Sequence, residues 1–540
     1  MVNDVSEGVD RLRAEYDAAP YLSNSYPQSA PGHLAAIAHF FGLDVPDVAG
    51  ARVLEIGCAS GGNILPFAAS HPDAHVVGID LSGVQIEQGR RLVDALGVAN
   101  LDLLEGDIAS MDLTALGQFD FVIAHGVYSW VPPNVQEAVL AAFRNLMAPD
   151  GVSYLSYNVY PGWKSKEILR DAMLLATRDS ATPDEKVLKA RRMVDLLEKE
   201  AKQGSVIAAA VAEFRASDAG AKSADFLLLH DELESFNAPC YFVDVLQRAG
   251  VHGLTFLAEA RPETMLLSNY SPDVAEFVLQ ECGNVQVLVE QYLDFLANRT
   301  FRETLLVHGE RAPQIRHGVD HSRYQRLHFA ARMSTAEGHT RLDNSRQVYV
   351  ARNKEKLQVD DPRMKAAFDA LTARWPWTLS RQELLDAVTA RLHASGIDAA
   401  GANLPQLVDH VLDVLIFQGG ARWRPDPVLP EPASAPLRLD EPIRRMVELT
   451  SAQGNAYTYN LWQELVGISA LDAHLLPMLD GTRDGDALVE ELMARNRANL
   501  LRVELDGKVL SDEAQLRQVF SEHVAALPQR LEQMGLLRVG

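Results

Sequence analysis

The stretch Ala51-Arg-Val-Leu-Glu55-Ile-Gly57-Cys-Ala-Ser-Gly61-Gly62-Asn63 decides the fold of this 540-residue chain. Its first half reads as a short apolar strand and its second half as a glycine-rich turn, with a helix expected behind it. Glycine has no Cβ, so the backbone of such a turn can approach a ligand closely. The free N–H groups at the start of the helix favour an anionic partner. The sequence therefore predicts a ligand-binding loop at the end of a strand.

Strands and helices alternate from Arg52 onward, which is typical of a mostly parallel α/β sheet. We expect seven strands, which together form a Rossmann-like sheet, at Arg52–Ile56, His75–Ile79, Leu101–Glu105, Phe119–Ala124, Val152–Val159, Gly253–Ala258 and Phe301–His308. Helices are predicted between them at Gly83–Leu96, Val135–Met147 and Tyr241–Ala249. Ligands of such sheets bind at the carboxyl ends of the strands.

The length of the chain predicts several domains. A helical insert is expected at 164–222, and its apolar faces need a partner, which suggests a dimerisation element. The middle domain combines three helices with short strands, so we expect a winged-helix-like α+β fold and an interaction or regulatory role. The predicted units are an N-terminal arm over the ligand site (1–50), the Rossmann-like domain (51–310), a middle domain (311–424), a proline-rich linker (425–439) and a mainly α C-terminal domain (440–540).

The charge balance excludes one class of partner. A formal net charge of −23 argues against a protein that binds duplex nucleic acid, and it is compatible with cationic substrates. Apolar runs stay well short of the roughly 20 residues that a membrane-spanning helix needs, so no membrane insertion is expected. Three scattered cysteines predict neither disulfides nor a zinc site, and a reducing cytoplasm is the expected location. His317, His321 and His328 read as a solvated face, so no metal is expected.

The glycine-rich turn by itself is compatible with two cofactors. Gly57-x-Ala59-x-x-Gly62 departs from the dinucleotide pattern only at Ala59, and Asp80 at the end of the second strand can bind ribose hydroxyls in either case. Asp107, which follows the third strand, distinguishes the two cofactors, because its carboxylate can accept a hydrogen bond from the amino group of an adenine. This acid favours S-adenosylmethionine (AdoMet) over a nicotinamide dinucleotide.

The predicted cofactor site extends over the neighbouring loops. Glu55 can anchor the turn or reach a bound ammonium group, and the polar arm can fold over the ligand. The full set of predicted cofactor-binding residues is Tyr26, Gln28, Glu55, Gly57, Cys58, Ala59, Gly61, Asn63, Asp80, Leu81, Asp107, Ile108 and His125.

Several longer motifs narrow the interpretation. They are Pro20-Tyr-Leu-Ser-Asn-Ser-Tyr-Pro-Gln-Ser29, the glycine-rich turn, His125-Gly-Val-Tyr-Ser-Trp-Val-Pro132, Tyr157-Asn-Val-Tyr-Pro-Gly-Trp163, Gln291-Tyr-Leu-Asp-Phe-Leu-Ala-Asn-Arg299 and Leu479-Asp-Gly-Thr-Arg483. With these residues the chain resembles class I AdoMet-dependent methyltransferases. More narrowly, it resembles bacterial protein-lysine methyltransferases with a methyltransferase regulatory domain, among them rickettsial enzymes that act on outer-membrane proteins. The resemblance implies a homodimer that methylates accessible lysines of a protein, an outer-membrane protein being one candidate, and releases S-adenosylhomocysteine (AdoHcy).

The acceptor pocket is expected beyond the fourth and fifth strands. Methyl transfer is an in-line displacement, so the main task of the enzyme is alignment. A lysine amine, with a free pKa of about 10.4, must also lose its proton, and a dry aromatic pocket favours that loss. His125 can act as a base or simply cap the sheet, and Asn158 can fix the amine. The candidates for this pocket, any of whose rings can instead be core residues, are His125, Tyr128, Trp130, Tyr157, Asn158, Tyr160 and Trp163.

Two other functions fit the same residues. A methyltransferase with a small-molecule acceptor would use the same cofactor site, although it would not need the long C-terminal extension. A non-catalytic AdoMet-binding scaffold or sensor would bind the cofactor without turnover.

Overall fold

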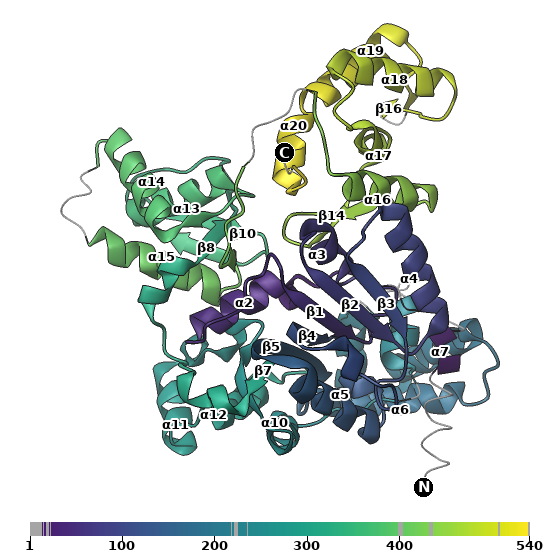
Figure 1. Ribbon diagram of the computed structural model, residues 1–540, viewed down its shortest axis with the longest axis vertical. Helices are drawn as coiled ribbons and strands as arrows, with labels where there is room; N and C mark the ends of the chain where they lie inside the picture. The colour runs from purple at the N-terminus through teal and green to yellow at the C-terminus, as the bar shows by residue number, and fades with distance from the viewer. Residues whose placement is uncertain are drawn as a thin grey trace.

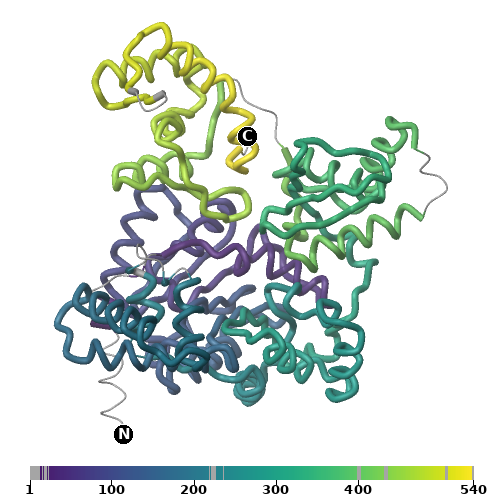
Figure 2. The backbone as a smooth tube through the Cα atoms, turned by 180° about the vertical axis from the view of Figure 1, so that it is seen from behind, coloured from purple at the N-terminus to yellow at the C-terminus, as the bar shows by residue number. Residues whose placement is uncertain are grey.

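The computed structural model describes residues 13–14, 16–17, 21, 23–217, 219–220, 225–234, 236–397, 403–430, 436–505 and 508–537. An α/β domain holds the central sheet, and a middle unit and a last unit extend from the same side of it (Figures 1 and 2). Within the described part of the chain, every helix is too short or too polar to span a lipid bilayer.

The structure confirms the Rossmann-like sheet. Seven strands lie in the order β3-β2-β1-β4-β5-β7-β6, in which β1 to β5 run parallel and β7 is antiparallel to its neighbours β5 and β6. Their bounds are Arg52–Ile56 (β1), His75–Asp80 (β2), Leu101–Glu105 (β3), Phe119–Ala124 (β4), Met147–Asn158 (β5), Leu254–Glu259 (β6) and Phe301–His308 (β7). The strand order reverses between β1 and β4, so the loops after these two strands open the crevice in which ligands bind.

Helices cover both faces of the sheet, which is why its inner strands are nearly continuous apolar runs. The helix α4 (Gly83–Leu96) begins at Ser82, whose hydroxyl accepts the N–H of Gln85, and ends at Gly97 in the left-handed conformation. The other helices of this domain are α2 (Pro31–Phe40), α3 (Leu65–Ser70), α5 (Pro133–Leu146), α10 (Phe242–Val251), α11 (Pro272–Cys282) and α12 (Gln286–Ala297). Almost all of α2 is buried, because it packs on the sheet and also contacts the middle unit.

The insert is helical, as predicted. It consists of α6 (Gly162–Thr177), α7 (Pro183–Glu200) and α8 (Val206–Ala216), and a π-helical turn, η4 (Leu228–Glu232), follows in the chain. Leu169, Met173, Val194 and Phe214 belong to a small hydrophobic core of its own. Its role in dimerisation stays a prediction.

The middle unit combines three helices with short strands, as expected, and its winged-helix-like fold stays a prediction. A three-stranded antiparallel sheet, in the order β12-β8-β13, packs with three helices, and a second small sheet is formed by β9, β10 and β11. The elements are β8 (His328–Ala331), β9 (Met333–Thr335), β10 (Gln347–Ala351), β11 (Lys356–Val359), α13 (Pro362–Arg374), β12 (Leu379–Ser380), α14 (Arg381–Ala394), α15 (Leu404–Phe417) and β13 (Ala421–Arg424).

The last unit is mainly helical, with two short hairpins that the sequence pattern did not predict. Its elements are α16 (Glu441–Ala452), β14 (Tyr457–Tyr459), β15 (Leu465–Gly467), α17 (Ala470–Leu475), α18 (Gly485–Arg497), β16 (Glu504–Leu505), β17 (Lys508–Val509), α19 (Glu513–Ala525) and α20 (Leu527–Met534). Of the predicted linker, residues 431–435 lie outside the described residues. The unit contacts the α/β domain, because Arg445 donates to the carbonyl oxygen of Ala95 (2.7 Å) and the Ser25 hydroxyl donates to the carbonyl oxygen of Gln463 (2.6 Å).

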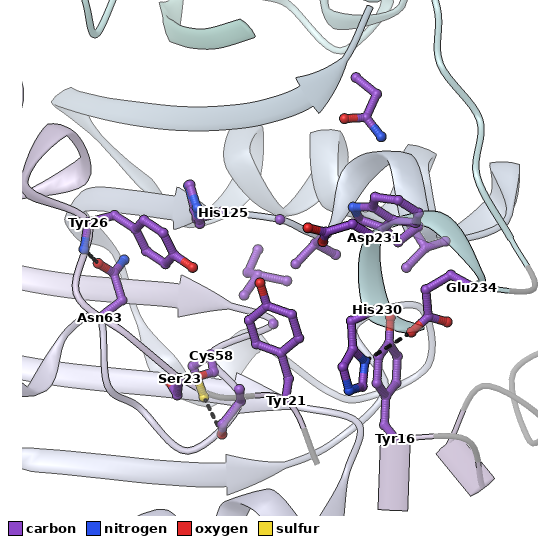
Figure 3. A pocket seen from close by; sticks show the side chains of 18 of the residues that line it. Tyr16, Tyr21, Ser23, Tyr26, Cys58, Asn63, His125, His230, Asp231 and Glu234 are labelled. Carbon is purple, nitrogen blue, oxygen red and sulfur yellow. Dashed lines mark hydrogen bonds and ion pairs between the residues drawn. The ribbon is translucent and has the colours of Figure 1, made fainter. Parts of the chain in front are cut away.

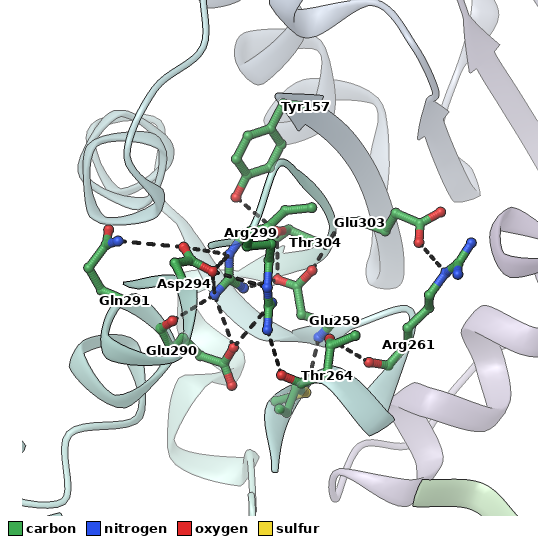
Figure 4. A network of polar contacts seen from close by, with 12 residues as sticks. Tyr157, Glu259, Arg261, Thr264, Glu290, Gln291, Asp294, Arg299, Glu303 and Thr304 are labelled. Atoms are coloured by element: carbon green, nitrogen blue, oxygen red, sulfur yellow. Dashed lines mark hydrogen bonds and ion pairs between the residues drawn. The ribbon is translucent and has the colours of Figure 1, made fainter. Parts of the chain in front are cut away.

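A buried ion network lies behind the last two strands of the sheet (Figure 4). The guanidinium group of Arg302 on β7 pairs with Glu259 (2.6 Å), Asp294 (2.8 Å) and Glu290 (3.1 Å), and Arg299 pairs with Asp294 (3.2 Å). The Arg302 side chain is fully buried. Buried charges are tolerated only when they are paired, so this network joins β6 and β7 to α12.

Replacement of Arg302 by methionine should destabilise the protein strongly, because three buried carboxylates would lose their shared cation. We expect the free energy of unfolding to fall by about 3–5 kcal/mol, measured by chemical denaturation. The matched control is Arg91→Met, which removes an exposed pair with Glu87 on α4 and should cost less than about 1 kcal/mol. Equal effects of the two substitutions would contradict this account of the network.

Candidate functional site

A cavity of about 600 Å³ opens at the carboxyl ends of β1, β2 and β4 (Figure 3). Its volume is typical of a cofactor or substrate site. The N-terminal arm, the glycine-rich turn, the segment 230–234 and the start of β7 all contribute to its walls. Residues of the arm thus line the cavity together with the glycine-rich turn.

The glycine-rich turn adopts a backbone that larger residues would not tolerate. Gly57 has φ 73°, and a Cβ placed on it would lie 2.1 Å from Cγ2 of Val127. A Cβ on Gly62 would lie 2.3 Å from the carbonyl oxygen of Ser23, so the arm presses directly on the turn. Ala59 also has a positive φ, of 50°. Glycine adopts positive φ readily, so the backbone of the turn is strained only at Ala59 and needs support from its neighbours there.

Asp80 holds the turn against the end of β2. One oxygen of its carboxylate accepts the N–H of Ala59 (2.7 Å) and the other accepts the N–H of Ser82 (2.9 Å). Burial raises the pKa of Asp80, and these backbone donors oppose that shift. Asp80 therefore braces the loop in addition to lining the cavity.

Asp107 also lines the cavity, at the position predicted for an adenine contact. Its carboxylate accepts the N–H of Ala109 (2.9 Å) and the hydroxyl of Ser110 (3.2 Å). Ile108 supplies an apolar wall beside it, and Leu81 lines the cavity next to Asp80. The acid and apolar groups that an adenosine moiety requires thus lie at one end of the cavity.

A buried carboxylate at the other side of the turn fits a cationic ligand. The side-chain amide of Asn63 donates to Oε1 of Glu55 (2.7 Å), and its Oδ1 accepts the N–H of Tyr26 (2.8 Å). Glu55 is 2% exposed, and its Oε2 has no hydrogen-bond partner among the described residues. Burial raises the pKa of Glu55 to about 8. The amino group of AdoMet would supply the missing partner, so the residues present fit this cofactor.

On the acceptor side, the structure brings together four of the predicted residues. His125, Trp130, Asn158 and Trp163 line the cavity, and the two indole rings meet edge to face with centroids 6.2 Å apart. The side-chain amide of Asn158 donates to Oδ1 of Asn237 (3.0 Å).

Three tyrosines predicted for the acceptor pocket do not line the cavity, and that expectation is wrong; they are Tyr128, Tyr157 and Tyr160. Tyr128 and Tyr157 are buried in the core, where Tyr128 accepts from Arg248 (3.5 Å) and Tyr157 bonds to Thr304 (2.9 Å). Tyr157 points to the opposite face of β5 from Asn158, because strand residues alternate.

Tyr160 and Gly61 also lie off the cavity. The hydroxyl of Tyr160 donates to Glu167 (2.7 Å), and Lys164 lies 4.1 Å above its ring. Gly61 supports the turn from behind, with its α-carbon against the side chain of Leu103. The other predicted cofactor residues, namely Tyr26, Gln28, Gly57, Cys58, Ala59 and Asn63, line the cavity.

The segment after the insert supplies residues that sequence reasoning missed. His230, Asp231, Glu232 and Glu234 line the cavity, and Figure 3 shows the carboxylate of Asp231 directed toward its interior. Burial raises the pKa of Asp231 and Glu232, and the ammonium group of Lys166 opposes the shift. The only signal in the sequence was three acids within four residues, which on its own indicates a solvated surface.

His125 is held by aromatic and polar contacts. Its ring lies against Tyr26, with centroids 3.8 Å apart, and its Nδ1 is 2.9 Å from the hydroxyl of Tyr154. Burial and the nearby charge of Arg261 lower the pKa of His125 to about 3. The imidazole is therefore neutral at neutral pH, and it acts as a hydrogen-bonding group more readily than as a base.

The three histidines of the middle segment do not form a common centre. His317 bonds to the carbonyl oxygen of Leu257 (2.9 Å), and His321 pairs with Asp413 (2.9 Å). In the described ranges, no three His, Cys, Asp or Glu side chains are grouped so that they would hold a metal ion.

Cofactor binding should release a proton from Glu55. Its carboxyl group is protonated below about pH 8 in the free protein, and a cationic amine at Oε2 favours the ionised form. We expect AdoHcy affinity to rise as pH increases toward 8, since the ionised fraction grows, and a proton to be released near neutral pH. Calorimetry in buffers of different ionisation enthalpy measures this release.

Glu55→Gln should abolish the release, because the amide cannot ionise. The control is Glu105→Gln, which changes an exposed carboxylate at the end of β3 and should leave the release intact. Binding without proton release in the unaltered protein would contradict the assignment.

Three family models match separate parts of the chain. Residues 53–151 match the methyltransferase domain family, 224–308 the predicted methyltransferase regulatory domain, and 442–536 the PKMT C-terminal winged helix domain. The winged-helix description thus falls on the last unit, which the sequence pattern predicted to be mainly helical, and not on the middle unit, for which a winged-helix-like fold is expected from the sequence.

Similar proteins and structures cover nearly the whole chain. An uncharacterized protein of Rickettsia prowazekii is 28% identical over 512 residues, which are 93% of this chain and 90% of that protein. A second protein of the same organism is 30% identical over 239 residues, 44% of this chain and 94% of that protein. PKMT2 from Rickettsia typhi, solved in complex with AdoHcy, is 24% identical and shares the fold with a TM-score of 0.83 over 96% of this chain and 100% of that chain. The chain belongs to the class I AdoMet-dependent methyltransferases that carry a methyltransferase regulatory domain and a PKMT-type C-terminal winged helix.

Proposed function

We propose that the methyl acceptor is the side-chain amine of lysine in a protein, so that the chain is a protein-lysine N-methyltransferase. One observation carries this proposal: the cavity that contains the cofactor cradle is also lined by two tryptophans and two carboxylates, Trp130, Trp163, Asp231 and Glu232. Aromatic faces and carboxylates attract an alkylammonium group and disfavour an anionic or neutral acceptor.

An ammonium group of the chain itself supports this assignment. Lys166 lines the same cavity, and its Nζ lies 5.1 Å from the centre of the Trp163 ring. Within the described residues, neither Asp231 nor Glu232 has a side-chain hydrogen bond or ion pair, although Glu232 is only 6% exposed. Both carboxylates are therefore available to a cation that enters the cavity.

The residues of the cavity can prepare the amine for reaction. When bound, AdoMet supplies a methyl group on a sulfonium that is open to in-line attack. Trp130 and Trp163 desolvate the entering ammonium group, which lowers its pKa. Burial raises the pKa of Asp231 and Glu232, and it thereby makes them better acceptors of the proton that the amine must lose.

The proposal extends to partners that the resemblance implies. The net charge of −23 favours a lysine-rich protein substrate, for which an outer-membrane protein is one candidate. The insert exposes Leu175, Leu188, Leu196 and Val206, apolar side chains that a second copy of the chain would cover in a homodimer. The match of residues 442–536 to a PKMT domain supports a protein as the acceptor.

The direct test is transfer of label from methyl-labelled AdoMet. The purified protein is incubated with a bacterial lysate, and proteins and small molecules are separated before mass spectrometry. We expect methylated lysines in proteins. Label confined to small molecules would establish the small-molecule alternative, and cofactor binding without label in either fraction would establish the scaffold alternative.

The double variant Asp231→Asn/Glu232→Gln should weaken acceptor binding specifically. It keeps the shape of the cavity and removes the negative charge of these two side chains, so we expect KM for a lysine-bearing substrate to rise at least tenfold, as for loss of a charged hydrogen bond of about 1.5–3 kcal/mol. The Kd for AdoHcy, measured by calorimetry, should stay unchanged. Asp171→Asn, an exposed acid on α6 outside the cavity, is the control. An unchanged KM in the double variant would contradict the role of the two acids.

A further inference from the structure

Three strands of the sheet contribute to one hydrogen-bonded chain that ends at the cavity. His125 follows β4, Tyr154 lies on β5 and Glu303 lies on β7. Nδ1 of His125 is 2.9 Å from the hydroxyl of Tyr154, which donates to Oε1 of Glu303 (3.0 Å). Oε2 of Glu303 pairs with Nε of Arg261 (2.5 Å). Each link has the length of a strong hydrogen bond or ion pair.

The protons in this chain can be assigned one by one. Glu303 forms an ion pair with the guanidinium group of Arg261, and in such a pair its carboxylate oxygens can only accept. The single hydroxyl proton of Tyr154 is donated to Glu303. The oxygen of Tyr154 therefore accepts from His125, and the proton of the neutral imidazole must be on Nδ1. Nε2 is left unprotonated.

The surroundings of the ring keep this nitrogen available. Tyr26 lies against one face of His125, and Phe301 meets its edge with centroids 6.3 Å apart, so the ring cannot turn freely. Gly126, the next residue, donates its N–H to the hydroxyl of Ser156 (2.8 Å), which fixes the backbone. His125 lines the cavity, and Nε2 has no hydrogen-bond partner among the described residues. Burial and the charge of Arg261 lower the pKa of His125 to about 3, so the ring stays an acceptor.

We propose that Arg261, Glu303 and Tyr154 are positioning residues, which hold His125 in its Nδ1–H form so that Nε2 accepts a hydrogen bond from the acceptor amine. No proton is transferred in this contact. The amine N–H donates to Nε2, and its lone pair is thereby left free for the methyl group. The identity of the donor as a lysine amine rests on the proposed function, whereas the state of His125 does not.

The first test reads the tautomer directly. Full-length protein with ¹⁵N-labelled histidine, bound to AdoHcy, is studied by NMR, and the signals of His125 are identified with His125→Gln. We expect a protonated Nδ1 and an unprotonated Nε2 that do not titrate between about pH 8 and about pH 5. Tyr154→Phe should mix the two tautomers, because Nδ1 loses its acceptor. A wild-type protein with the proton on Nε2 would overturn the proposal.

The matched control is Tyr157→Phe. It also removes a buried hydroxyl from β5. This hydroxyl, however, lies on the opposite face of the strand, where it bonds to Thr304 (2.9 Å). This variant should leave the His125 signals unchanged. If both variants changed them alike, the effect would be general repacking and the proposal would fail.

The second test concerns the amine. Titration of Nα-acetyl-lysinamide into the AdoHcy complex should shift the Nε2 signal of the wild-type protein, and kcat of Tyr154→Phe should fall about tenfold with an unchanged Kd for AdoHcy. Methylated lysine in proteins without this shift would overturn the positioning role alone. The expected tautomer and shift, with no lysine methylated in any protein, would overturn the proposed function and leave the assignment of the hydrogen-bonded chain intact.

Discussion

The carboxylate of Asp80 fixes the glycine-rich turn, and the cofactor site is built around this turn. By accepting the N–H groups of Ala59 and Ser82, it ties the glycine-rich turn to the end of β2 and to the start of α4. The turn contains positive φ angles at Gly57 and Gly61, which glycine adopts readily, and at Ala59, where such a backbone is unfavourable without support. The cofactor cradle is thus braced at its strained residue by one carboxylate.

The cavity contains carboxylates that lack the compensation seen in the Arg302 network. Among the described residues, Oε2 of Glu55 has no hydrogen-bond partner, and the side chains of Asp231 and Glu232, which line the same cavity, have no hydrogen bond or ion pair. Burial raises the pKa of all three, so each gains from a cation that arrives. By contrast, the carboxylates around Arg302 are already compensated, and they serve the stability of β6, β7 and α12.

The regulatory-domain segment is part of the site and not only an appendage. Residues 224–308 supply the acidic wall at 230–234 and also β6, α12 and β7. Arg261 and Glu303 from this segment reach His125 through Tyr154. The arm is braced in its turn by the last unit, through the contact of Ser25 with Gln463. A short series of contacts thus connects the last unit to the cofactor cradle.

The sheet, its helices and the carboxylates at the strand ends can be predicted from the amino-acid sequence. These features follow from local rules, because buried parallel strands need apolar runs and ligand loops need glycine at fixed places. Glu55, Asp80 and Asp107 could be predicted because they lie beside the glycine-rich turn or at the carboxyl ends of these strands, where ligands bind. The resemblance to a known family then indicated the acceptor.

Which side chains contact one another depends on the packing of the folded chain. Periodicity could not show that Tyr128 and Tyr157 are core residues, since the side of a strand or turn that faces the cavity depends on what packs against it. It also could not place Asp231 in the same cavity as Trp130 and Trp163, or join Tyr154 to Glu303, 149 residues further along the chain. Such contacts arise where distant segments converge, and no local pattern in the sequence records them.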